Sequence, residues 1–95
     1  MTADEPILRH GYRDRRILIA GRQPATRSAL EMLLQEEDGL KVVGKAVDIN
    51  DLLRQVGPTC PDVVVLDWDL PGAPIQTLLA SLRDLGYHAY VVVLS

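Results

Sequence analysis

Four consecutive apolar residues that end in a carboxylate constrain this chain more than any other feature. Val63 to Leu66 form the apolar run, Asp67 ends it, and Pro71-Gly72 supplies a turn soon afterwards. A short apolar run between turn signals is typical of a strand buried on both faces, as in a parallel sheet covered by helices. Asp67 is therefore predicted to lie at the carboxyl end of an interior strand, the edge of an open parallel sheet where ligands usually bind.

Strands and helices are predicted to alternate along the rest of the chain. Strands are predicted at the apolar runs 17–20, 40–44, 63–66 and 90–94. Helices are predicted around the apolar stripes Leu30/Leu33/Leu34, Ile49/Leu52/Leu53/Val56 and Ile75/Leu78/Leu79/Leu82, which are read as core faces. Pro24 and Asp48 suit helix starts, and Gly57-Pro58 and Gly86 suit helix ends. The order βαβαβαβ predicts an α/β fold with a parallel sheet, and the run 90–94 is expected to be a buried strand.

Composition places the chain among small globular domains. It has 95 residues, of which 47% are hydrophobic, enough for one domain with a modest core. The mostly polar residues 1–15 are predicted to form a flexible leader, and residues 16–95 the folded domain. A net charge of -3 gives no support for nucleic-acid binding, and no apolar run reaches the roughly 20 residues that span a bilayer. The single cysteine, Cys60, excludes an intrachain disulfide, so we expect a cytoplasmic location.

Several short motifs occur with the spacing of a known signalling family. They are the strand Ile17 to Ala20, Pro24 opening a helix, Val42-Val43-Gly44 followed by Ala46, the turn Asp67-x-x-Leu70-Pro71-Gly72, and Ser95. From about Arg16 to Ser95 the chain resembles the receiver domain of bacterial two-component response regulators, and it is most similar to the NarL/LuxR type. The resemblance implies a flavodoxin-like (CheY-like) fold, with helices on both faces of a parallel sheet of strand order 2-1-3-4-5.

The resemblance also implies roles for individual residues. Asp67 matches the phosphoacceptor that a partner histidine kinase phosphorylates, and Ser95 matches the switch hydroxyl. An output module outside this segment, often a DNA-binding domain, would read the phosphorylated state. The implied function is signalling in a phosphorelay and in transcription regulation. The sequence shows no nucleophile pair and no phosphate-binding loop, so an enzyme is not expected.

The loop after the first strand departs from the family pattern. Receivers place two adjacent acidic residues there to hold Mg²⁺, whereas this chain has Gly21 and Arg22. Mg²⁺ needs several oxygen ligands, often carboxylates, so Asp67 alone makes a poor cage and autophosphorylation is expected to be slow or absent. Two alternatives remain for Arg22: it pairs with Asp67 in place of the metal, or it points to solvent. No metal or other cofactor is predicted, and His10 and His88 have no partners at metal-ligand spacing.

The last strand and the only tryptophan raise the question of partners. Receivers continue beyond the position of Ser95 through a helix, a fifth strand and a fifth helix, so this chain is expected to be shortened, with its last βα units missing. The run 90–94 would then form an exposed edge, which a second copy or another chain is expected to cover. Trp68 either anchors a partner or packs over its own loop.

Three functional hypotheses follow from these patterns. The first is a degenerate pseudo-receiver that acts as a protein-interaction module in two-component or transcriptional regulation. The second is a working receiver phosphorylated on Asp67. The third and weakest is a flavodoxin-like ligand-binding domain, which rests on fold alone.

Overall fold

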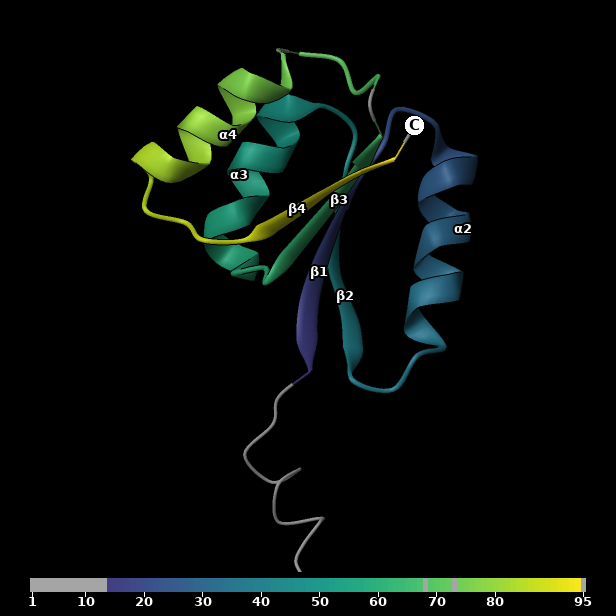
Figure 1. Cartoon of the computed structure of the whole chain (residues 1–95). Helices are drawn as coiled ribbons and strands as arrows, with labels where there is room; N and C mark the ends of the chain where they lie inside the picture. Colours follow the sequence, from purple (N-terminus) through teal and green to yellow (C-terminus); the bar gives the residue numbers. More distant parts are fainter. Residues whose placement is uncertain (1–13, 68, 73, 95) are drawn as a thin grey trace, which may run out of the picture.

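The described part of the chain forms a four-stranded parallel sheet with three helices (Figure 1). The computed structural model describes residues 14–67, 69–72 and 74–94. In chain order the elements are β1 (Arg15–Ala20), α2 (Pro24–Gln35), β2 (Leu40–Ala46), α3 (Ile49–Thr59), β3 (Val63–Asp67), α4 (Ile75–Asp84) and β4 (Tyr90–Leu94). The strand order is β2-β1-β3-β4, and every pairing is parallel. This arrangement confirms the predicted flavodoxin-like fold as far as β4.

Helices cover both faces of the sheet, with α2 on one side and α3 and α4 on the other (Figure 1). Side chains alternate along the two central strands, so each strand contributes to two cores. Leu18 and Leu66 point into the core beneath α3 and α4, and Ile19 and Val65 point into a smaller core beneath α2. Because Val64, Val65 and Leu66 are all buried, β3 is the interior strand that its apolar run predicted.

The two edges of the sheet differ in chemistry. The β2 edge carries Lys41 and Lys45, and the register of its pairing with β1 shifts between Ile17 and Leu18. Both features disfavour pairing of β2 with a further strand. β4 carries no charge, and Tyr90 and Val92 are 78% and 45% exposed. The prediction that this run is a buried strand was therefore wrong. The reason is that α2 packs on β1 and β2, which leaves the corresponding face of β4 uncovered.

Three local features differ from the sequence-based expectations. β1 begins at Arg15, two residues earlier than the predicted strand. α3 continues through Pro58 to Thr59, because a proline late in a helix costs only one hydrogen bond and the left-handed Cys60 then ends the helix. Leu33 is 63% exposed, because the narrow contact of α2 with β1 and β2 uses Leu30 and Leu34 instead.

Reciprocal hydrogen bonds define the start of α3. Asp48 accepts from the Asp51 amide at 2.7 Å, and Asp51 accepts from the Val47 amide at 3.0 Å. Asp51 also accepts from Arg54 at 2.6 Å. The hydrogen bond from Arg54, followed by those from the Val47 amide and Gln55, lowers the pKa of Asp51 below its ordinary value. Together these contacts anchor the helix start that the Asp48 pattern predicted.

Replacing Asp51 by Asn is expected to lower the free energy of unfolding at pH 7 by about 0.5–1 kcal/mol, because an amide is a weaker partner for Arg54 and Val47. Since the folded-state pKa is depressed, the ionised carboxylate stabilises the fold above its ordinary pKa of 3.8, and this contribution disappears as the pH falls through the lower folded value. Urea denaturation should show that the difference in free energy of unfolding between wild type and the Asp51→Asn variant becomes smaller as the pH is lowered. A difference independent of pH would contradict this, and Glu36→Gln at an exposed position controls for the lost charge.

Candidate functional site

The predicted site lies where β1 and β3 end side by side. Ala20 pairs with Leu66, so the residues that follow them, Gly21 and Asp67, meet at the same edge of the sheet. A Cβ atom at position 21 would lie 3.2 Å from Oδ2 of Asp67, closer than most Cβ contacts. Gly21 is buried and Asp67 is half-buried. The structure thus brings together two positions that the sequence singled out, with the carboxylate close to where a side chain at position 21 would begin.

Arg22 does not pair with Asp67 in the structure. Its side chain is exposed. The two ion pairs among the described residues join Lys45 to Glu31 and Arg54 to Asp51. Of the two alternatives for Arg22, the structure therefore shows the one that points to solvent.

Arg27, which sequence reasoning missed, is the cation that lies inside the site. It belongs to the first turns of α2 and donates from Nη1 to the Gly21 carbonyl at 2.6 Å and to the Arg22 carbonyl at 3.2 Å. Its Cγ would lie 3.4 Å from the same Cβ position that approaches Asp67. Helical side chains tilt toward the helix N-terminus, so Pro24 at the helix start could have indicated that position 27 reaches back over the preceding loop.

The loop after β3 is held against α3. The Ile49 amide donates to the Pro71 carbonyl at 3.0 Å, and Leu70 is buried beneath the loop. Gly72 has φ +129°, and a Cβ there would lie 2.7 Å from Cβ of Ile49. This close approach explains the Pro-Gly turn and fixes the chain just after Asp67. Trp68 and Ser95 lie outside the described residues, so their predicted roles stay predictions.

The donor set around Asp67 does not make a good magnesium cage. Among the described residues, no three histidine, cysteine or acidic side chains gather where they could hold a metal ion. Mg²⁺ favours a near-octahedral set of oxygen ligands. Gly21 has no side chain, and the side chain of Arg22 is a cation. The chemistry that the site does offer is a carboxylate at an open sheet edge, next to a loop held by a guanidinium.

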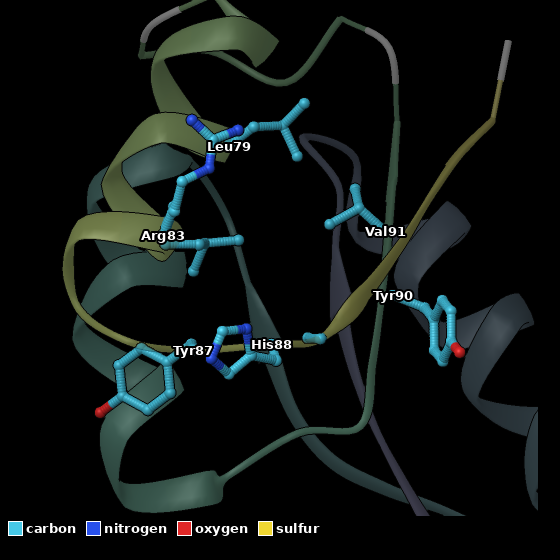
Figure 2. Close-up of a pocket in the computed structure, with 8 residues that line it drawn as sticks. Leu79, Arg83, Tyr87, His88, Tyr90 and Val91 are labelled. Atoms are coloured by element: carbon cyan, nitrogen blue, oxygen red, sulfur yellow. The ribbon is translucent and has the colours of Figure 1, made fainter.

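A separate hollow lies between α4 and β4, and Figure 2 shows Arg83, Tyr87 and His88 around it. Its volume is about 440 Å³. The lining residues are Leu79, Leu82, Arg83, Tyr87, His88, Ala89, Tyr90 and Val91. They lie around the start of β4, whereas Asp67 ends β3, so the hollow contains none of the predicted site residues.

Within the described residues, no helix has both the length and the apolar character that a membrane span requires.

Comparison with known sequences gives one family match over most of the chain. The model of the response regulator receiver domain matches residues 17–95. The chain is 35% identical over 95 residues to protein-glutamate methylesterase/protein-glutamine glutaminase 5 of Myxococcus xanthus, covering 100% of this chain and 25% of the relative. It is 36% identical over 70 residues to the transcriptional regulatory protein DesR of Bacillus subtilis, covering 74% of this chain and 35% of the relative. The chain therefore spans about a third or less of these relatives.

Solved structures give the same fold. The signal receiver domain of the response regulator NarL from Mycobacterium tuberculosis aligns with a TM-score of 0.78 and 25% identity, covering 85% of this chain and 65% of that one. A two-component response regulator of the LuxR family from Aurantimonas aligns with a TM-score of 0.76 and 28% identity, covering 84% of this chain and 57% of that one. These matches confirm the resemblance to the NarL/LuxR type.

Replacing Gly72 by Ala is expected to destabilise the protein by about 2–4 kcal/mol, because the new Cβ combines an unfavourable φ with a close contact to Ile49. Gly39→Ala is the matched control: its φ is +86°, but nothing lies within 4 Å of the added atom. The control should cost only about 1–2 kcal/mol. Urea denaturation of both variants checks that Gly72→Ala loses more unfolding free energy than Gly39→Ala. Equal losses of unfolding free energy would show that the contact with Ile49 does not contribute.

Proposed function

Because the chain belongs to the response regulator receiver domain family, we propose that it is an atypical receiver whose state is set by protein contacts rather than by Mg²⁺-dependent phosphorylation of Asp67. Receiver domains are signalling modules of two-component systems and are generally not enzymes. The single observation that carries the proposal is which residues lie beside Asp67 at the carboxyl ends of β1 and β3. Gly21, which adjoins the carboxylate, has no side chain, and Arg22 carries a cation that points to solvent. Neither residue therefore supplies an acidic ligand.

The physical argument concerns the charge of the phosphoryl group. Phosphoryl transfer relies on a cation that neutralises the oxygens of the moving group, and Mg²⁺ usually supplies it. A single carboxylate binds Mg²⁺ weakly, because the ion keeps its waters unless several protein oxygens replace them. Transfer to Asp67 is therefore slow, and the unmodified carboxylate is the working state of the domain.

One observation favours a working receiver as the second candidate. Asp67 is half-buried at the carboxyl end of β3, so part of its surface is accessible to solvent. A small phosphodonor could reach such a carboxylate. In that case Asp67 would be the phosphoacceptor of a partner histidine kinase, with Ser95 as the switch hydroxyl.

The uncovered strand β4 supports a partner-binding role. Its edge is unpaired in the described sheet, its residues are uncharged, and Val92 and Val93 are exposed on opposite faces. An uncharged, apolar edge strand invites pairing with a further strand. A second copy of this chain that pairs edge to edge would bury both β4 strands. A histidine kinase and a DNA-binding output domain outside this segment are the further partners that family membership favours, and we propose a cytoplasmic location for this chain.

Incubation with Mg²⁺ and acetyl phosphate should leave the mass of the wild-type protein unchanged, because the site lacks the acidic pair. In the variant Gly21→Asp/Arg22→Asp, we expect Mg²⁺ binding and the gain of one phosphoryl group, which the further substitution Asp67→Ala removes. Intact mass spectrometry under non-acidic conditions measures both. Wild-type protein that gains the group, and loses this ability on Asp67→Ala, would refute the atypical receiver and establish the second candidate.

Sedimentation velocity should show self-association of the wild-type chain at micromolar concentration. Val92→Lys, on the exposed face of β4, is expected to shift the protein to monomer, because a lysine on an edge strand opposes pairing. Leu33→Lys is the matched control, since Leu33 is equally apolar but lies on α2 and is 63% exposed. A stable monomer for wild-type protein, or equal dissociation by both variants, would exclude pairing through β4.

A further inference from the structure

We propose that Arg27 is a positioning residue that holds the loop beside Asp67 in place without a metal ion. The inference rests on the proposed function, because it describes what replaces the metal in an atypical receiver. In this view the guanidinium organises the Gly21–Arg22 segment by binding its backbone, so the site keeps one conformation in the absence of Mg²⁺.

The first support is the hydrogen-bond geometry. One nitrogen of Arg27 reaches two successive carbonyls, at 2.6 Å to Gly21 and 3.2 Å to Arg22. Hydrogen bonds from a charged donor are stronger than neutral ones, and a planar guanidinium directs its donors with fixed geometry. The Gly21 amide donates in turn to the Ala46 carbonyl at 3.0 Å, which joins the same loop to the end of β2. The loop is thus held from the helix on one side and from the sheet on the other.

The second support is the contrast between the neighbouring arginines. Arg22 lies in the loop itself and is exposed, whereas Arg27 lies on α2 and is half-buried. Helix α2 packs on β1 and β2, so the backbone of Arg27 is held against the same sheet that carries Asp67. A cation on a rigid element can determine the position of a loop, but a cation on the loop cannot.

The third support is the position of Arg27 relative to Asp67. The side-chain stem of Arg27 and the carboxylate of Asp67 both approach the empty Cβ position of Gly21. The charged guanidinium itself lies on the carbonyls of Gly21 and Arg22, the two residues that replace the acidic pair. A divalent cation would be repelled by it, so Arg27 stabilises the metal-free site and disfavours the metal-bound one.

Hydrogen exchange measured by NMR on the full chain tests the positioning role. Arg27→Met should accelerate exchange of the Gly21 amide, which donates to the Ala46 carbonyl, by about tenfold or more, because the carbonyl contacts that order the loop are lost. Arg22→Met and Arg83→Met, which remove exposed arginines, should leave this rate within about twofold of wild type. Mg²⁺ should not change the wild-type rate. Unchanged exchange in Arg27→Met, or equal acceleration in Arg22→Met, would overturn the proposal.

A second measurement separates positioning from simple packing. In the background Gly21→Asp/Arg22→Asp, adding Arg27→Met should tighten Mg²⁺ binding by about threefold or more, because a positive charge beside the ion is removed. Arg27→Lys in the same background keeps the charge and should bind Mg²⁺ no more tightly than the parent. If Arg27→Met weakens Mg²⁺ binding or leaves it unchanged, the charge of Arg27 does not act on the site.

The remaining outcomes are also decisive. If Arg27→Met fails to fold, Arg27→Lys carries the exchange test: an intermediate rate at the Gly21 amide supports the proposal, and the wild-type rate contradicts it. Neither measurement uses a phosphodonor. Phosphorylation of wild-type protein would thus refute the proposed function alone, whereas wild-type exchange in the Arg27 variants would refute the positioning role alone.

Discussion

The parallel pairing of β1 with β3 is the constraint on which the rest of the site depends. Ala20 and Leu66 are register partners, so the chain leaves both strands at the same edge and Gly21 meets Asp67. The pairing holds because both strands are buried from both sides, with α2 covering one face and α3 and α4 the other. Since a shift by one residue would turn every core side chain to the other face, the register and hence the site are strongly specified.

The site that results is organised around backbone rather than around acidic side chains. Arg27 binds the carbonyls of the loop after β1, and the Ile49 amide binds the carbonyl of Pro71 in the loop after β3. Both anchoring groups belong to the first turns of helices that pack on the sheet. Asp67 therefore lies beside a loop that a guanidinium holds and begins a loop that a backbone amide holds. The proposed atypical receiver rests on this arrangement.

The two lateral edges of the sheet differ in how far they are protected against pairing with a further strand. Lysines and an irregular register protect β2, while β4 is uncharged and exposes Tyr90 and Val92. An unprotected edge next to uncovered apolar side chains is a surface that becomes stable when another strand pairs with it.

Sequence alone determined the element order, the interior position of β3, the helix start at Asp48 and the glycine that ends α4. These follow from local rules: apolar periodicity, capping and turn chemistry act over a few residues and are visible in one dimension. Only the tertiary structure decided that residue 21 meets Asp67, that Arg27 and not Arg22 binds the loop beside it, and that Leu33 and β4 are not buried. Those outcomes depend on how β1 pairs with β3, on how far α2 reaches across the sheet and on where its side chains point, and such arrangements arise only when elements remote in sequence pack together.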